Sequence, residues 1–184
     1  MKIISVIPAR GGSKGIPRKN MRLMHGKPLI SYAIENALNC DLINEVVVSS
    51  DSEEVLAYAS QFKSVICLDR SSELAQDAVT LDPVIYDAVV RCEKSFDTRY
   101  DAVVTLQPTS PLLSVDTLSR ALRSFINSDV DSMISVVNEP HLRWKRDDKG
   151  RIVQDYIERL NRQQLPPSYW ETITELMNEW KAKL

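Results

Sequence analysis

The chain has 184 residues, of which 43% are hydrophobic and 26% are charged, and its net charge is -2 at pH 7. These values are ordinary for a single globular domain with a sizeable core. The near-neutral charge argues against a general nucleic-acid or membrane-surface role, and no stretch approaches membrane-spanning length.

Apolar, β-branched runs alternate along the chain with stretches whose apolar residues recur at helical spacing. In chain order they predict strand 2–7, helix 28–38, strand 45–50, helix 52–62, strand 64–68, helix 83–92, strand 101–106, helix 116–126 and strand 132–137. This alternation is typical of βαβ crossovers. We therefore predict an α/β fold with a mainly parallel sheet.

The alternation ends after residue 137. Residues 138–172 are polar and Arg-rich, which predicts an arm or hairpin. Residues 173–184 carry a narrow apolar stripe, which predicts a terminal amphipathic helix. Within one domain overall, we expect an α/β core at 1–137, an arm at 138–172 and the helix at 173–184.

Ligands of parallel sheets bind outside the carboxyl ends of the strands. This rule indicates three places in the chain. They are the loop that follows Ile7, the "SSDSEE" stretch that follows Val48, and the "QPTSP" stretch that follows Leu106.

The first of these loops, "PARGGSKGIPRKN" (8–20), lies in a segment of unusual charge. Residues 1–34 hold seven basic side chains and no acid, which leaves 16 basic against 25 acidic side chains in the rest of the chain. Loop glycines expose N–H groups and permit positive φ, so that a turn can wrap around anionic oxygens. The loop is either a solvated basic turn or a phosphate-binding loop, and its position directly after the first strand favours the second.

Three stretches together resemble the cytidylyltransferases that activate acidic sugars. "IPARGGSKGIPRKN" resembles the N-terminal signature of that family, which includes acylneuraminate (CMP-sialic acid), legionaminate and pseudaminate cytidylyltransferases. "DRSSELAQD" (69–77) and "LQPTSPL" (106–112) match two further segments in order and spacing, and "RLNRQQLPPSYWET" resembles a later one. The resemblance covers residues 2–172.

The resemblance implies a three-layer α/β/α sandwich of the nucleotide-diphospho-sugar transferase kind. It also implies a nucleotide site and a neighbouring sugar site. The residues expected to bind nucleotide are Arg10, Gly11, Gly12, Ser13, Lys14, Lys19, Asn20, Arg70 and Thr80, with Asn20 near cytosine. Those expected on the sugar side are Gln107, Pro108, Thr109 and Ser110.

The implied reaction joins CTP to an acidic nonulosonate-type sugar and releases pyrophosphate. The sugar hydroxyl would attack the α-phosphorus in line, so that catalysis rests on alignment and charge neutralisation, with Mg²⁺ bridging phosphates. Arg10, Lys14 and Lys19 are the expected catalytic cations.

Structural alternatives remain open for several of these residues. Arg70 could form a surface ion pair with Glu73. Thr109 and Ser110 could be turn formers between two prolines. Asp77 matches a family acid but is expected to cap the next helix.

The chain departs from the family pattern after Tyr169. The aspartate pair that the family uses for Mg²⁺ is absent, because no aspartate follows Asp155, and the chain looks C-terminally truncated relative to the family. Asp51 is then either a substitute metal ligand or a helix N-cap. The alternative function is a non-catalytic CTP- or CMP-binding module, or a decayed paralogue. A sugar-1-phosphate nucleotidyltransferase ranks lower because its G-x-G-T-R-type loop is not present.

The expected setting is the cytoplasm. Cys40, Cys67 and Cys92 are scattered and odd in number, as in a protein that keeps its thiols reduced. The resemblance also implies a homodimer that pairs through the arm. The expected partners are thus CTP, an acidic sugar and a second copy, with no nucleic acid and no membrane.

Overall fold

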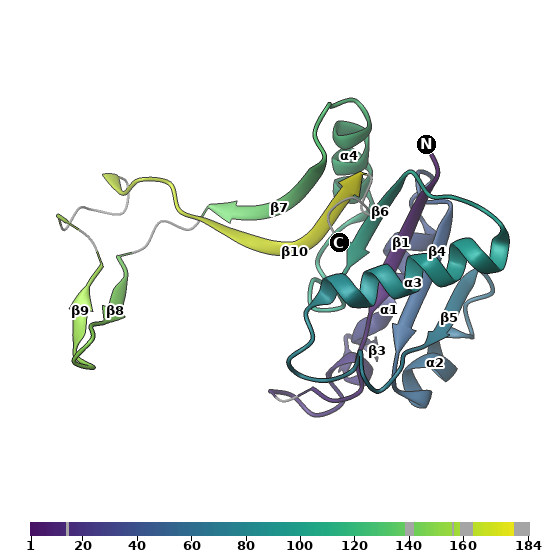
Figure 1. Cartoon of the computed structure of the whole chain (residues 1–184), viewed down its shortest axis with the longest axis horizontal. Coiled ribbons are helices and arrows are strands. Elements are labelled where there is room, and N and C mark those ends of the chain that lie inside the picture. Colours follow the sequence, from purple (N-terminus) through teal and green to yellow (C-terminus); the bar gives the residue numbers. More distant parts are fainter. Residues whose placement is uncertain (14, 139–141, 156, 159–163, 179–184) are drawn as a thin grey trace. The chain divides into compact units, whose positions relative to one another are not determined.

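The computed structural model describes residues 1–13, 15–138, 142–155, 157–158 and 164–178, the last nine of them as backbone (Figure 1). They form two compact units, namely unit 1 (Met1–Ile134 with Ile173–Leu184) and unit 2 (Ser135–Thr172). In chain order the elements are β1 (Ile3–Pro8), the 3-10 helix η1 (Lys19–Met21), β2 (Leu23–Met24), β3 (Lys27–Pro28), α1 (Leu29–Leu38), β4 (Glu45–Ser50), α2 (Glu53–Ala59), β5 (Val65–Asp69), α3 (Leu81–Phe96), β6 (Ala102–Leu106), α4 (Val115–Ile126), β7 (Ser132–Asn138), β8 (Trp144–Arg146), β9 (Ile152–Gln154) and β10 (Tyr169–Asn178).

A six-stranded sheet has the order β5-β4-β1-β6-β10-β7. β1 is parallel to β4 and to β6, and β4 is parallel to β5. β10 is antiparallel to β6. The predicted α/β fold with a mainly parallel sheet is therefore confirmed.

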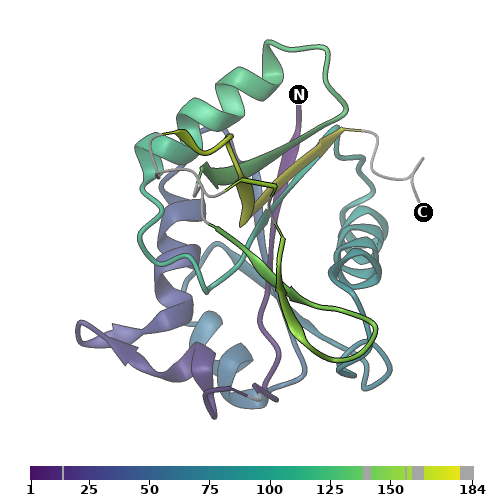
Figure 2. The same cartoon turned by 90° about the vertical axis from the view of Figure 1, so that its left-hand side faces the viewer.

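Helices cover both faces of this sheet (Figure 2). Ile3 and Ile7 of β1 point to one face and pack with buried residues of α1, α2 and α4. Ile4 and Val6 point to the other face and pack with buried residues of α3. This alternation along a fully buried strand produces the three layers that the resemblance implied.

The predicted helices correspond to α1, α2, α3 and α4, with differences at their ends. α3 begins at Leu81, so Pro83 lies inside its first turn, where the missing N–H has no intrahelical partner to lose. Pro28 is the N-cap of α1 rather than its first residue.

The prediction of an amphipathic helix over 173–184 was wrong for the residues that can be compared. Residues 173–178 belong to β10, which pairs with β6 from Thr174 opposite Leu106 to Asn178 opposite Ala102. β-branched residues at 172–174 favour a strand, and β10 covers what would otherwise be an unpaired edge of β6. Residues 179–184 lie outside the described part of the chain.

Unit 2 contains an antiparallel hairpin of β8 and β9, in which Lys145 lies opposite Val153. Its turn is held by Asp147, whose side chain accepts hydrogen bonds from the backbone of Lys149 and Arg151 and forms an ion pair with the Arg151 guanidinium. The hydrogen bond from Arg151 lowers the pKa of Asp147. Residues 139–141, 156 and 159–163, which the predicted arm includes, lie outside the described residues.

Among the described residues, no helix combines the length and the apolar character needed to cross a membrane.

Candidate functional site

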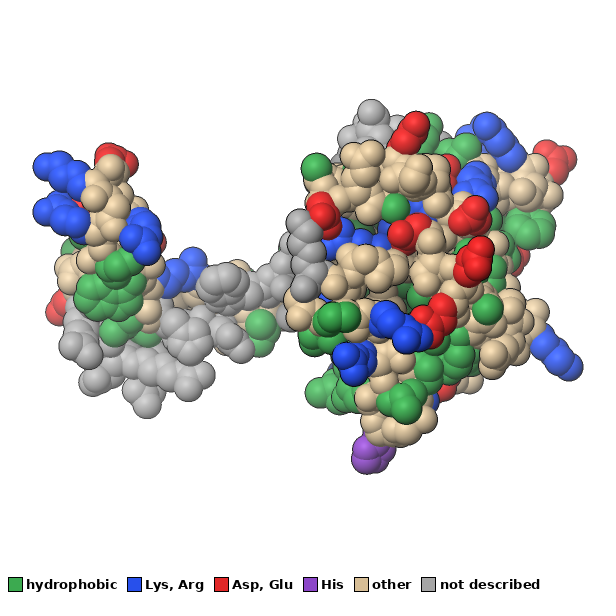
Figure 3. Space-filling model, turned by 90° about the horizontal axis from the view of Figure 1, so that it is seen from below, with side chains coloured by type: hydrophobic (Ala, Val, Ile, Leu, Met, Phe, Trp, Pro, Cys, Tyr) green, Lys and Arg blue, Asp and Glu red, His purple; other side chains and the backbone are tan. Residues whose placement is uncertain are grey.

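A cavity of about 550 Å³ opens at the carboxyl ends of β1, β5 and β6 in unit 1. Its walls are the loop after β1, the segment between β5 and α3, and the loop after β6. Figure 3 shows Lys and Arg side chains beside Asp and Glu side chains at this end of unit 1. The predicted site residues that line the cavity are Arg10, Ser13, Lys19, Asn20, Arg70, Thr80, Gln107, Pro108 and Thr109.

Three of the predicted residues that the structure describes are not among those lining it. Gly11 and Gly12 belong to the loop after β1 but do not line the cavity, and neither does Ser110. Ser110 closes a turn in which its N–H donates to the Gln107 carbonyl at 3.1 Å. Lys14 lies outside the described residues.

The base of the loop after β1 is held by side chains. Pro8 lies opposite Ser49 in the β1–β4 ladder, which brings Ala9 beside Ser50. The Ser50 hydroxyl donates to the Ala9 carbonyl at 2.6 Å, and the buried Asn20 amide donates to the Arg10 carbonyl at 3.0 Å. These hydrogen bonds hold the carbonyls of Ala9 and Arg10 in place. The backbone position of Arg10 is therefore fixed in the ligand-free protein.

Gly11 is needed for close packing rather than for positive φ. A Cβ at Gly11 would lie 3.0 Å from Ser52 Cβ, whereas Gly12 and Gly15 have nothing within 4 Å. None of these three glycines has positive φ, and the left-handed residue of this stretch is Arg18 at φ 53°. The expectation that positive-φ glycines wrap the loop around a ligand was therefore wrong for the described residues.

Asp51 holds the same loop. Its Oδ1 accepts the Gly11 N–H at 2.9 Å, so this N–H is already engaged within the protein. The N-cap of α2 is Ser52, whose hydroxyl accepts from Val55 N at 3.5 Å, which corrects the N-cap alternative for Asp51. The described residues contain no group of three His, Cys, Asp or Glu side chains that could hold a metal ion.

Arg70 is the most deeply placed cation of the cavity, at 5% exposure. The β4–β5 register sets Ser50 opposite Asp69, and the next residue, Arg70, donates its N–H to the Ser50 carbonyl at 2.9 Å while its side chain reaches back to Ser49. Arg70 Nη2 donates to the Ser49 carbonyl at 2.6 Å, and Nε donates to the Ser49 hydroxyl at 3.2 Å. The expected alternative of a pair with Glu73 was wrong.

No carboxylate contacts Arg70 within the described part of the chain. Burial lowers the pKa of Arg70, the Asp51 carboxylate raises it, and the charge of Arg10 lowers it. A buried guanidinium is seldom left without an anionic partner, because its desolvation is then uncompensated. The cavity therefore favours an anionic ligand.

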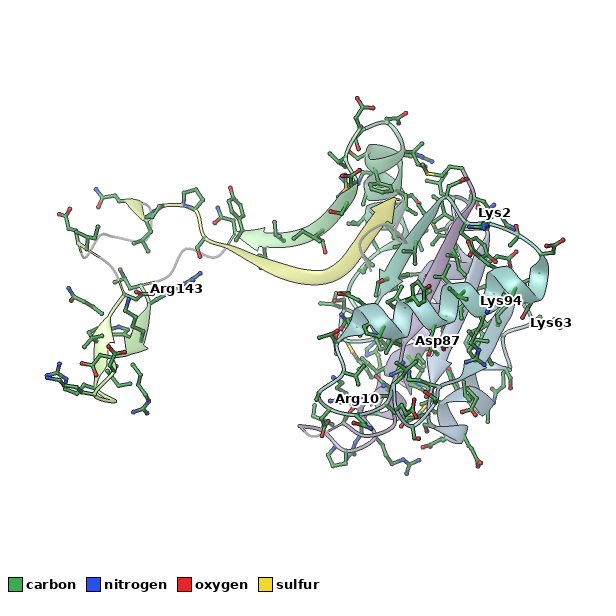
Figure 4. The ribbon with its side chains drawn as sticks, viewed as in Figure 1. Lys2, Arg10, Lys63, Asp87, Lys94 and Arg143 are labelled. Carbon is green, nitrogen blue, oxygen red and sulfur yellow. The ribbon has the colours of Figure 1, made fainter. Side chains whose placement is uncertain are left out.

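Arg10 and Asp77 come from two different walls of the cavity and form an ion pair, with Arg10 Nη1 at 2.8 Å from Asp77 Oδ1. Figure 4 labels Arg10 near the beginning of α3. Asp77 was expected to cap the next helix, but the N-cap of α3 is Thr80.

The N-terminus of α3 meets the cavity through Thr80, Leu81 and Val84. The Thr80 side chain makes no capping hydrogen bond. The first N–H groups of a helix of this length carry a partial positive charge that favours anions. Two arginines, Lys19 and a helix N-terminus thus surround one cavity, an arrangement suited to several phosphate groups.

Sequence reasoning missed Ser49. This serine positions Arg70 although the two residues are 21 positions apart. The sequence signal for a role of Ser49 was its position near the carboxyl end of a predicted strand. Its contact with Arg70 could be assigned only from the structure.

The cationic cavity lies at the carboxyl ends of the strands, where α/β sheets of this kind bind their ligands. The fold is similar to a solved structure of CMP:2-keto-3-deoxy-manno-octonic acid synthetase complexed with CTP, with a TM-score of 0.66, 17% identity, and coverage of 97% of this chain and 74% of that one. The sequence matches the family described as "Cytidylyltransferase" over residues 4–159, and the chain belongs to that family.

Two curated relatives are similar over most of the chain. The pseudaminic acid cytidylyltransferase of Campylobacter jejuni is 44% identical over 128 residues, which are 70% of this chain and 55% of the relative. The CMP-N,N'-diacetyllegionaminic acid synthase of Legionella pneumophila is 35% identical over 156 residues, which are 84% of this chain and 67% of that protein. The chain thus spans about half to two thirds of the length of these relatives.

Proposed function

We propose that the chain binds CTP in this cavity and transfers its cytidylyl group to an acidic nonulosonate-type sugar, releasing pyrophosphate. The observation that carries the proposal is Arg70, a guanidinium at 5% exposure that lines the cavity without a carboxylate contact in the described residues. A phosphate group supplies the missing negative charge and matches the planar donor fork of arginine.

The phosphates are proposed to lie among Arg10, Lys19, Arg70 and the N-terminus of α3, with Ser13 and Thr80 as hydroxyl partners. Asn20 lies buried at the same cavity. One of its amide hydrogens is used by the Arg10 carbonyl, and we assign its Oδ1 to the cytosine side. Lys14, Gly11 and Gly12 complete the proposed set on the strength of the family signature alone.

The loop after β6 is proposed to face the sugar. Gln107, Pro108 and Thr109 line the cavity. Ser110 stays in the proposed sugar-side set from the family segment, beside its turn hydrogen bond. An amide and a hydroxyl here would hold sugar hydroxyl groups, which need both donors and acceptors.

The proposed reaction makes few chemical demands on the protein. The sugar hydroxyl oxygen forms a bond to the α-phosphorus, the bond from the α-phosphorus to the diphosphate breaks, and the hydroxyl proton passes to water. Arg10, Lys19 and the family-assigned Lys14 would hold the phosphates in line and neutralise charge on the departing pyrophosphate. Removing a preorganised electrostatic contact of this kind usually lowers kcat by on the order of a hundredfold.

Mg²⁺ is part of the proposal only as an ion that travels with the triphosphate. The described residues offer no group of three metal-ligating side chains, and Asp51 already uses Oδ1 on the Gly11 N–H. These residues do not fit a protein-held magnesium site, and no step above depends on one.

The class of sugar rests on the relatives, whose names specify pseudaminic and legionaminic acids. Both are acidic nine-carbon sugars, in keeping with a cationic site. The sugar of this chain is proposed to belong to the same class.

We further propose a cytoplasmic homodimer that pairs through unit 2. Six large apolar side chains among the described residues of this unit are exposed, namely Val136, Val137, Trp144, Ile152, Ile157 and Tyr169. Exposed apolar and aromatic groups at this density are typical of protein interfaces. The three cysteines are free, which agrees with a reducing compartment.

A pyrophosphate-release assay tests the proposed function. CTP, Mg²⁺ and purified pseudaminic, legionaminic or N-acetylneuraminic acid are supplied to the full chain, with omission of sugar and replacement of CTP by UTP as controls. We expect release that requires CTP together with at least one of the sugars. Arg70→Met should abolish it, whereas Lys94→Met, on the exposed last turn of α3, should leave it unchanged.

A thermal-melting measurement with CTP, made beside this assay, separates the two functions that the cavity can serve. Thermal stabilisation by CTP without product from any sugar would favour the non-catalytic nucleotide-binding module. Absence of both stabilisation and product would contradict a CTP site altogether.

A further inference from the structure

The ion pair between Arg10 and Asp77 spans the cavity that is proposed to receive the phosphates. Arg10 lies on the loop after β1 and Asp77 on the segment between β5 and α3, and both line the cavity. Their side chains are 37% and 51% exposed, so the pair lies at the solvent side of the cavity, whereas Arg70 lies at its buried side.

The pair neutralises one cation of the site in the ligand-free protein. Arg10 and Arg70 are close enough to repel each other, since the charge of Arg10 lowers the pKa of Arg70. A carboxylate at 2.8 Å from Arg10 offsets part of this repulsion. The same carboxylate repels any phosphate that approaches Arg10.

We propose that Asp77 is an internal counter-ion that a polyphosphate displaces from Arg10, so that Asp77 limits the affinity of the site for its nucleotide. The inference rests on the proposed function, because it takes the cavity to be a phosphate site. The Arg10–Asp77 contact is made through one nitrogen and one oxygen, whereas a phosphate can meet the guanidinium fork with two oxygens and carries more charge. Replacing Asp77 by phosphate is favourable, but the free energy of phosphate binding is smaller by the free energy of the Arg10–Asp77 ion pair that is lost.

Calorimetric titration with inorganic tripolyphosphate tests this displacement, because that probe contains no cytosine or sugar. Asp77→Asn should bind tripolyphosphate about two- to fivefold more tightly than the wild type, the range that corresponds to loss of a partly exposed ion pair. The matched control is Glu73→Gln, which makes the same change of charge on the same segment. Glu73 is exposed and does not line the cavity, so its replacement should change the affinity by less than about 1.5-fold.

A double-mutant cycle assigns the effect to the pair. In an Arg10→Met background, Asp77→Asn should give a clearly smaller gain in tripolyphosphate affinity than it gives with Arg10 present, because no Arg10–Asp77 ion pair is left to break and only the repulsion by the carboxylate is removed. Melting of each ligand-free variant is measured alongside, and the exposed, nearly isosteric Asp77→Asn change should leave the fold intact.

Unchanged or weaker binding in Asp77→Asn would overturn the inference, since Asp77 would then be neutral or would hold Arg10 in place for the ligand. An equal gain in Glu73→Gln, or an undiminished gain from Asp77→Asn in the Arg10→Met background, would overturn it as well. In each of these cases the wild type still binds tripolyphosphate, so the phosphate site itself survives. Absence of binding in every variant would overturn the phosphate site together with the inference.

Discussion

The two ends of the sheet in unit 1 each bury a polar group in a different setting. At the carboxyl ends of the strands, Arg70 is 5% exposed and contacts no carboxylate among the described residues. Just before the amino end of β6, Tyr100 is 6% exposed, and its hydroxyl has no hydrogen-bond partner among the described residues. Arg70 lines a cavity with other cations, whereas Tyr100 packs in the apolar cluster beside α3 and does not line that cavity. An unsatisfied buried group thus indicates a ligand site only where it opens onto a cavity with converging partners.

Arg70→Met should give the largest loss of CTP affinity, and this loss should distinguish the ligand-binding end of the sheet from the end at Tyr100. We expect CTP affinity to fall by about a hundredfold, because a charge-assisted, bidentate phosphate contact is lost. The free energy of unfolding of the ligand-free protein should not fall, since the change removes a buried charge and the Ser49 carbonyl keeps the Ala9 N–H as a donor. Calorimetry and urea unfolding measure the two quantities.

The control for this prediction is Arg18→Met. Arg18 is an exposed arginine that already pairs with Glu54, which raises the pKa of Arg18. Its replacement should change CTP affinity by less than about twofold. Equal losses of affinity in both variants would mean that basic character alone, rather than the buried position, binds the nucleotide.

Gly11→Ala should give the next largest effect. A Cβ at Gly11 would lie 3.0 Å from Ser52 Cβ, so the loop must shift away from the N-cap of α2 and carry Arg10 with it. We expect about a tenfold loss of kcat/KM, because displacement of an aligned contact by a few tenths of an ångström weakens catalysis disproportionately. Steady-state pyrophosphate release measures it.

Gly12→Ala is the matched variant, because a Cβ at Gly12 would meet nothing within 4 Å. It should retain nearly all activity. Equal values of kcat/KM in Gly11→Ala and Gly12→Ala would mean that the packing of the loop after β1 against Ser52 does not affect the site.

Tyr100→Phe should give the smallest effect of these variants, and it should stabilise the folded protein. Removing a buried hydroxyl that no described group satisfies should raise the free energy of unfolding by about 1 kcal/mol and leave CTP affinity unchanged. Ser5→Ala removes the other such hydroxyl and should act similarly. A loss of stability or of CTP affinity in Tyr100→Phe would contradict the contrast between the two ends.

The alkaline behaviour of Tyr100→Phe gives a second readout. Burial, with smaller effects of Cys92, Glu45 and Glu93, raises the pKa of Tyr100 from 10.0 to about 12. Between these values the unfolded chain releases the phenolic proton and the folded chain keeps it, so the free energy of unfolding falls as pH rises. The fall should be shallower in Tyr100→Phe, measured by urea unfolding at several pH values.

The sequence alone could predict most of unit 1 because its signals are periodic. The β-branched runs 2–7 and 45–50 lie in strands buried on both faces, and the stripe over 116–126 suits a helix that covers one face. The stretch that begins at residue 173 was predicted as a helix because its apolar spacing fits both a helix and a strand. It forms a strand because it pairs with the edge of β6.

Several of the residues predicted for the site line one cavity, whereas contacts between residues distant in sequence were not predicted. Arg10 and Lys19 could be selected because they lie in the basic loop that follows the first predicted strand, and Arg70 because its segment resembles one of the family. The partners Ser49 and Asp77 could not be assigned, because their contacts depend on the β4–β5 register and on the path of the segment before α3.

A crystal structure of the full chain with CTP tests the central claim most directly. We predict phosphate oxygens within about 3 Å of the Arg70 guanidinium, the distance of a charge-assisted hydrogen bond, with the nucleotide occupying the cavity at the carboxyl ends of β1, β5 and β6. CTP bound elsewhere, or bound in this cavity with Arg70 contacting only Ser49, would contradict the account.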